Sequence, residues 1–331
     1  MSGVKGVLAH ETWFTPERPA YDWTFLAEPA TLALVAVALA VAVAWRLVGR
    51  RLPRPELPFL APLGRLSPWI PRLLAVHAGV SLLAQAARGT YLAPALTLPD
   101  NAWGIALRFV EGLVGVWLIS GIRIRWAALA VVLSGPLGMP AYGFVPILER
   151  MDLLGVALFL FLLPPGEHRW GAASVDGPTV ERAVLWLRLL VGGALIVLAF
   201  TEKLARPALA LLFLERFPAF NILQTVGLDV GDTMFVRVAG AVELLFGLLI
   251  VSGRLPQLVV VLAGIPFNAT LFFLGTEELI GHLPIYGAML ALLVYGSDRT
   301  LAGVVDTFSP REPVVLGPRE LLDTAADRSG G

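Results

Sequence analysis

The stretch AVELLFGLLIVSG, residues 241–253, places a single glutamate, Glu243, in an otherwise apolar run. The run belongs to a segment, 233–252, close to the 20 or so residues that a helix needs to cross a bilayer. Eight other segments share this character: 31–48, 72–87, 102–120, 126–145, 147–163, 182–200, 256–274 and 279–296. The sequence therefore predicts an all-α, polytopic membrane protein with about nine transmembrane helices.

The composition agrees with a lipid bilayer as the protein's environment. Apolar residues make up 57% of the chain and charged residues 15%, with a mean hydropathy of +0.76. Cysteine is absent, which excludes disulfides, thiolate metal sites and thiol redox chemistry in this chain. The histidines, at positions 10, 77, 168 and 282, match no metal-ligand spacing, so no metal site is predicted.

The basic residues predict the orientation in the membrane, because cytoplasmic loops are enriched in Arg and Lys. With the N-terminus outside and the C-terminus inside, 16 arginines fall in the cytoplasmic segments and 7 basic residues in the outer ones. The Arg-rich stretch at 46–54 is explained by this topology, so we expect no nucleic-acid partner. We expect a multi-pass protein of the plasma membrane.

An internal repeat organises the chain. The stretch FVEGLVGVWLISG, residues 109–121, aligns with 241–253 at a shift of 132 and pairs Glu111 with Glu243. Upstream, Arg72-Leu-Leu aligns with Arg188-Leu-Leu at a shift of 116, so the second copy has 16 extra residues. Each copy holds four predicted helices. Since four is even, both copies keep the same orientation, as a parallel repeat.

The domain boundaries follow from this repeat. The extracytoplasmic segment, 1–30, carries aromatic residues suited to the membrane interface, namely Trp13, Phe14, Tyr21, Trp23 and Phe25. We expect no cleavable signal peptide in it. A leading helix, 31–48, and a linker rich in Pro and Arg, 49–71, precede repeat A at 72–163. A second linker, 164–181, leads to repeat B at 182–297. The tail, 298–331, is expected to be a weakly ordered cytoplasmic extension.

Glu111 and Glu243 are the main candidates for chemistry. Each is predicted near mid-membrane, where a carboxylate must be protonated, paired or in contact with water. In repeat A, Arg108 lies one turn from Glu111 and is available as an ion-pair partner. Repeat B has a glycine there, so Glu243 needs a partner from another helix. Both glutamates are open to a structural interpretation, as contacts that lock four helices, and to a role in handling protons, a quinone or a substrate.

The candidate partners of Glu243 come from the rest of repeat B. They are Lys203 at the outer end of its first helix, Asn268 in its third helix and His282 in an outer loop. A snorkelling lysine or a surface histidine would explain two of them without function. We group Glu243, Lys203 and His282 as candidate catalytic residues. Candidate pocket residues are Asn268, Glu202, Arg188, Glu111 and Arg108.

Residues 188–254 carry a family resemblance. The pattern RLLVGGALIVLAFTEKLARP followed by AVELLFGLLIVSGR resembles the DoxX-like family of four-helix membrane proteins. The matching positions are Arg188, Lys203, Pro207, Glu243, Gly247, Gly253 and Arg254. Repeat A lacks the Lys-Leu-Pro element. The family takes its name from the membrane subunit of a thiosulfate:quinone oxidoreductase, so the resemblance implies a membrane subunit or anchor of a redox system. It leaves the cofactor unassigned, with quinone as one candidate.

Three functional hypotheses remain open from the sequence. The first is a component of a quinone-linked oxidoreductase that binds a quinone or small anion at Glu243 and Lys203. The second is a non-catalytic scaffold that recruits a soluble redox protein at the cytoplasmic face. The third is a small-solute transporter, which the duplicated bundle and the central acids favour.

Overall fold

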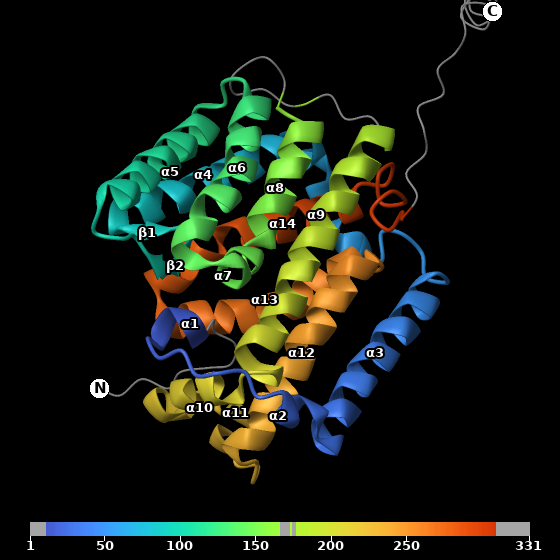
Figure 1. The fold of residues 1–331 in the computed structure, drawn as a ribbon. Helices are drawn as coiled ribbons and strands as arrows, with labels where there is room; N and C mark the ends of the chain where they lie inside the picture. The colour runs from blue at the N-terminus through green and yellow to red at the C-terminus, as the bar shows by residue number, and fades with distance from the viewer. Residues whose placement is uncertain (1–10, 166–172, 174–176, 309–331) are drawn as a thin grey trace, which may run out of the picture.

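The computed structural model describes residues 11–165, 173 and 177–308. Over these residues it is helical except for one short hairpin (Figure 1). The calls on His10, on His168, on most of the 164–181 linker and on the tail from residue 309 lie outside the described residues.

Long apolar helices dominate this part of the chain because only a helix satisfies every backbone polar group inside a bilayer. Seven of the helices in the described ranges are long and apolar enough to cross a membrane, so the protein is an integral membrane protein of the multi-pass type. They are α3 (Pro29–Gly49), α4 (Ile70–Arg88), α5 (Ala102–Ser120), α6 (Ile124–Tyr142), α9 (Gly177–Leu198), α12 (Asp232–Ser252) and α14 (Thr276–Ser297).

The other two predicted spans are also helical. The helix α8 (Met151–Leu162) is shorter than a full span, and α13 (Pro256–Leu274) is apolar over Pro256–Leu271. Between α6 and α8 the chain breaks at Gly143, with φ of 82°, and forms the short helix α7 (Phe144–Leu148). The sequence predicted a boundary between two spans at 145–147. The structure has the short helix α7 there.

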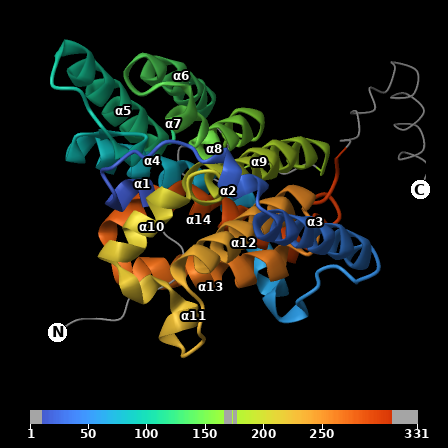
Figure 2. The same cartoon turned by 60° about the horizontal axis from the view of Figure 1, so that its bottom comes forward.

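The helices pack in a pattern that relates the two halves of the chain. In the first half α4 lies against α5, and in the second α9 lies against α12. The last helix of each half packs on the first helix of the other, α8 on α9 and α14 on α4. The leading helix α3 lies along the outside of α12, with most of its surface exposed to the surroundings (Figures 1 and 2).

Glycine pairs allow the first two helices of each half to come close. A Cβ on Gly79 would lie 2.8 Å from the Gly115 carbonyl oxygen, and one on Gly192 would lie 2.6 Å from that of Gly247. Helices in lipid associate through such close packing, since no hydrophobic effect drives them together there.

One end of the molecule carries several short elements and is called the α1 end here. It is formed by α1 (Glu11–Phe14), α2 (Trp23–Ala27), α10 (Pro207–Arg216), the 3₁₀ turn Pro218–Phe220 and α11 (Ile222–Thr225), which Figure 2 brings forward. The stretch between α9 and α12 thus contains the short helices α10 and α11, and α10 packs on α12. A hairpin of β1 (Thr90–Tyr91) and β2 (Ala93–Thr97) follows α4.

The opposite end is held by polar contacts of the linker and the tail. The linker forms a 3₁₀ helix, Pro58–Trp69, packed on α14. The first part of the tail is not the weakly ordered extension that we predicted. Val305 is fully buried there, and Asp306 pairs with Arg54 at 2.7 Å and with Arg254. These ion pairs tie the tail to two loops.

Candidate functional site

The site is centred on Lys203, whose position depends on a change of helix type. After Leu198 the helix α9 continues as one wider π turn, Ala199–Leu204, and the chain then leaves the helix at Ala205. Such π turns are rare and often lie at functional sites. Lys203 is 2% exposed, so the snorkelling interpretation is wrong for it.

Two carboxylates from distant parts of the chain bind the Lys203 ammonium group. Its Nζ lies 2.9 Å from Oε2 of Glu11 and 3.0 Å from Oε2 of Glu243. Glu243 is 11 residues into α12, roughly 16 Å along the helix from its start. The structure thus gives Glu243 one of its three predicted partners.

Glu202, the residue before Lys203, holds the beginning of α1. Its carboxylate accepts hydrogen bonds from the backbone N–H groups of Glu11 at 3.2 Å and Thr12 at 3.4 Å, and also from the Thr12 hydroxyl. Glu202 is fully buried. Because a helix begins with N–H groups that have no partner in the helix, an anion at this place satisfies them.

The centre holds more acidic than basic groups. One ammonium faces the carboxyl groups of Glu11, Glu202 and Glu243. Burial raises the pKa of Glu11 well above its usual range; the charges of Glu202 and Glu243 add to this rise, and Lys203 opposes it. Glu11 therefore binds a proton readily, and we call Lys203 with these three carboxyl groups the lysine centre.

His282 is a buried neighbour of α1 and not the loop residue that we predicted. It lies in α14, which begins at Thr276, and it is 2% exposed. Its Nδ1 lies 3.5 Å from a carboxylate oxygen of Glu278, and its ring centroid is 4.8 Å from that of Trp13. Trp13 fits there because position 281 is glycine; a Cβ would lie 2.3 Å from the indole ring.

Glu149 and Arg150 approach the same region from the α7–α8 junction. Burial raises the pKa of Glu149 to about 7; the charge of Glu202 adds to this rise, while Arg150 and Arg206 oppose it. The Arg150 guanidinium lies over the Trp13 ring, 5.6 Å from its centroid. The α1 end therefore gathers several buried or partly buried acids around one tryptophan.

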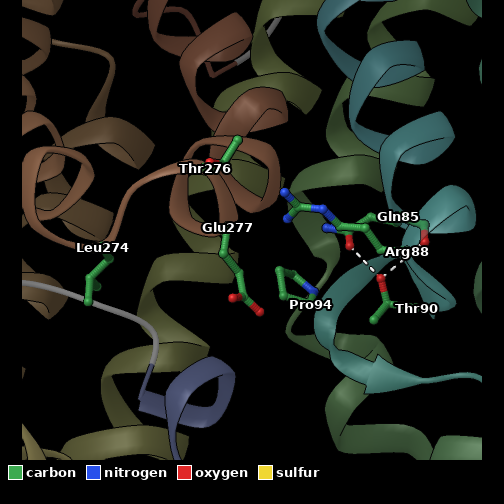
Figure 3. Close-up of a pocket in the computed structure, with 7 residues that line it drawn as sticks. All are labelled: Gln85, Arg88, Thr90, Pro94, Leu274, Thr276 and Glu277. Carbon is green, nitrogen blue, oxygen red and sulfur yellow. Dashed lines mark hydrogen bonds between the residues drawn. The ribbon is translucent and has the colours of Figure 1, made fainter.

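A polar pocket of about 410 Å³ opens at the α1 end between the two halves (Figure 3). One wall comes from α4 and the hairpin, the other from α13 and α14. The Arg88 and Glu277 side chains extend from these opposite walls (Figure 3). Glu277 lines the pocket, and the next residue in the chain is Glu278, the buried acid beside His282. The polar pocket therefore lies close to this acid.

Two predicted pocket residues do not join the lysine centre. Asn268 is exposed and donates to the Gly264 carbonyl oxygen in its own helix at 2.7 Å. Arg188 lies 15 residues before Lys203, roughly 22 Å away along the helix. It is fully buried in the middle of α9 and donates to the Val251 carbonyl oxygen at 2.8 Å and to that of Thr307. Arg188 therefore caps the end of α12.

The equivalent acid in the first half has a different environment. Glu111 is 1% exposed and accepts a hydrogen bond from the backbone N–H of Leu92 at 2.6 Å, so the hairpin occupies the place that Lys203 takes in the second half. Arg108 does not pair with Glu111 as predicted. Its guanidinium donates to the Ala86 and Ala87 carbonyl oxygens at 2.7 and 3.0 Å, because the last carbonyls of α4 have no partner in the helix.

Sequence reasoning missed four residues of this region: Glu11, Trp13, Glu149 and Arg150. Trp13 was assigned to the membrane interface together with Phe14, Tyr21, Trp23 and Phe25, but it is only 9% exposed, whereas Trp23 is 64% exposed. A weak signal was present in Glu11, an acid two residues before a tryptophan in a segment otherwise interpreted as interfacial.

Neither the geometry nor known proteins point to a resident metal or a family. Among the described residues, no three His, Asp or Glu side chains are placed to hold a metal ion. Comparison with family models, curated proteins and solved structures gives no match. The resemblance to DoxX-like proteins therefore stays a prediction from the residues quoted above.

Proposed function

We propose that the protein is the membrane subunit of a quinone-linked redox system and that the lysine centre supplies protons to the quinone. The observation that carries this proposal is the pairing of Lys203 with both Glu11 and Glu243 while Glu202 is buried beside them. Buried ionisable groups inside a membrane are costly, and they are functional candidates for this reason.

Proton exchange is the chemistry that the charges support best. With one cation and three carboxyl groups, removing every acidic proton would leave excess negative charge in a low dielectric, so the centre favours holding at least one proton. His282 and Glu278 extend the polar groups from α1 toward the pocket of Figure 3. That pocket offers a route from solvent for protons to replace those consumed.

Reduction of a quinone to a quinol consumes two electrons and two protons. In this proposal the lysine centre handles the protons. The electrons come from a soluble redox protein, which must approach the quinone itself to reduce it. Arg50, Arg51 and Arg65, in the linker at the opposite end, would attract an acidic surface of a partner that is only anchored there.

The proposal includes nine spans in two like-oriented four-helix repeats. Equivalent contacts support this arrangement. Arg72 donates to the Ile119 carbonyl oxygen and Arg188 to that of Val251, 132 positions later. A Cβ on Gly155 would meet Leu190, and one on Gly287 would meet Leu74, again at matching positions of the two copies. The arginine distribution favours a plasma-membrane orientation with the α1 end outside.

The test compares the two equivalent acids. The protein would be purified in mild detergent with its copurifying electron donor, and reduction of a short-tailed ubiquinone analogue would be followed. We expect Glu243→Gln to lower the rate by about a hundredfold, as for loss of an acid–base group, and Glu111→Gln to retain most of it. Equal rates for wild type and Glu243→Gln would contradict the proposal.

A non-catalytic scaffold is the second candidate, favoured by one observation. The Glu11–Lys203–Glu243 contacts tie the N-terminal segment to two helices, which a structural lock would also require. In that case a redox protein would copurify and be lost on deletion of residues 309–331, while Glu243→Gln left its quinone-reduction rate unchanged.

Small-solute transport is the third candidate, and the opposed Arg88 and Glu277 side chains of the polar pocket favour it. A zwitterion would match two opposite charges. Uptake of labelled amino acids into vesicles with an imposed proton gradient would show it, and Glu277→Gln should then abolish uptake.

A further inference from the structure

A second cavity lies between α6, α7 and the beginning of α8. Its volume is about 320 Å³, which is within the range of small-molecule sites. The lining is apolar except for one charged residue and includes Leu92, Val131, Met139, Phe144, Leu154 and Arg150. Gly135 of α6 leaves room for it, since its position carries no side chain.

Arg150 is the polar group of this cavity and is only 5% exposed. Its guanidinium lies over the Trp13 ring, 5.6 Å from the ring centroid, and the residue lines the cavity. A guanidinium has five N–H donors and no acceptor, so it binds ligands through their oxygen acceptors. The cavity is therefore shaped for a molecule with an apolar body and an oxygen acceptor at one end.

The cavity is accessible from the lipid. Phe144, which lines it, is 61% exposed, and α6, which supplies much of the lining, is apolar and long enough to span a membrane. A hydrophobic ligand dissolved in the membrane would reach Arg150 without crossing water. Trp13 contacts both Arg150 and His282, so a ligand held by Arg150 is separated from the His282 side of the site by one indole ring.

We propose that this cavity binds the head group of a quinone, with a ring carbonyl oxygen accepting a hydrogen bond from Arg150. This inference rests on the proposed function, because it assigns a place to the same quinone. A quinone fits the chemistry of the cavity: its ring and methyl groups suit the apolar lining, and its carbonyl oxygen is an acceptor for the N–H donors of Arg150, the one charged residue of the lining.

Binding can be measured without any turnover. The purified full-length protein in lipid nanodiscs would be titrated with a short-tailed ubiquinone analogue, and a photoreactive azido form would be cross-linked and mapped by mass spectrometry. We expect cross-links in α6–α8. Loss of a hydrogen bond to a charged group predicts a Kd about tenfold or more higher for Arg150→Met, while Arg150→Lys retains part of the affinity.

A second variant tests the cavity without altering Arg150. A Cβ on Gly135 would meet Ile147 at 3.5 Å, an ordinary contact, so Gly135→Leu fills the space and should weaken binding at least as much. Gly264→Leu is the matched control, because it adds the same side chain to α13, where the Cβ would meet only Asn268 at 3.7 Å. We expect its Kd to equal that of the wild type.

The outcomes separate this inference from the proposed function. If both Arg150→Met and Gly135→Leu bind the quinone as tightly as the wild type, the cavity at Arg150 is not the quinone site. The proposed quinone-linked function would still stand. No quinone binding to the wild type would overturn both. Arg150-dependent binding of oleate, tested in the same nanodiscs, without binding of the quinone analogue would make the cavity a lipid site and overturn the quinone assignment.

Discussion

The Nζ of Lys203 lies 2.9 Å from a carboxylate oxygen of Glu11, although the two residues are 192 positions apart in the chain. This contact joins the N-terminal segment to the π turn Ala199–Leu204 that follows α9. It also makes the stability of α1 depend on a buried charge of that turn.

Removing Lys203 should destabilise the protein strongly. Lys203→Met leaves Glu11 and Glu243 without their cation in a buried place, which typically costs about 3–5 kcal/mol. Adding Glu243→Gln should recover part of this loss, because one uncompensated carboxyl group is then neutral. Thermal unfolding in detergent, compared among wild type, single and double variants, would measure both effects.

The exposed ion pair of Arg216 with Glu17 provides the control. It also links the N-terminal segment to the second half, but its side chains are 37% and 48% exposed. Arg216→Met should change stability by no more than about 1 kcal/mol, as for other exposed pairs. If Lys203→Met were as mild as Arg216→Met, the lysine centre would not hold the N-terminal segment in place.

Gly281→Ala should detach α1 without altering any charge. The added methyl group would lie 2.3 Å from the Trp13 ring, which must then move away from His282. We expect faster cleavage by a glutamate-specific protease after Glu17, which follows α1. Gly264→Ala should be cleaved at the wild-type rate, because its Cβ would make only an ordinary contact, with Asn268 at 3.7 Å. Equal cleavage of both variants would show that Trp13 does not anchor α1.

Glu149 should make stability depend on pH. Its pKa is about 7 in the folded protein, against an ordinary value of 4.5, so the folded protein binds this proton more tightly than the unfolded chain. The resulting stabilisation is complete below pH 4.5 and is lost as the pH rises through 7. After allowance for partial exposure, the loss is on the order of 2 kcal/mol.

The measurement compares melting temperatures at pH 5 and pH 8. Glu149→Gln should melt a few degrees above the wild type at pH 8, since it stays neutral, and close to it at pH 5. Asp229→Asn, at an exposed site near α11, should shift the melting temperature equally at both values. If the difference in melting temperature between Glu149→Gln and the wild type were the same at pH 5 and pH 8, the raised pKa of Glu149 would be refuted.

Orientation can be tested cleanly because the chain contains no cysteine. Val226→Cys, 66% exposed at the α1 end, should react with a membrane-impermeant maleimide on intact cells. Ile122→Cys, 43% exposed at the other end, should react only after permeabilisation. The reverse pattern would place the α1 end in the cytoplasm.

Local sequence features predicted the helices well and some of their contacts. Nine apolar segments correspond to nine helices, because the pattern that makes a helix stable in lipid is written in consecutive residues. The sequence alignment of the two halves paired Arg72 with Arg188. The two residues make equivalent contacts, since each donates to carbonyl oxygens at the end of the neighbouring helix. Sequence spacing predicted Glu111 as the partner of Arg108, and this prediction was wrong. Arg108 binds carbonyl oxygens at the end of α4.

The sequence by itself determined that the chain resides in a membrane and that Glu243 is an acid inside it, because hydropathy and spacing act over single helices. Only the tertiary structure decided which groups complete the site. Glu11 and Trp13 come from a short segment without a long apolar run, and Arg150 comes from the beginning of the apolar segment 147–163. The packing of α1 against α14 and the π turn brings Glu11 to Lys203 and Trp13 to His282 and Arg150. Such contacts depend on distances between segments far apart in the chain, which no local pattern records.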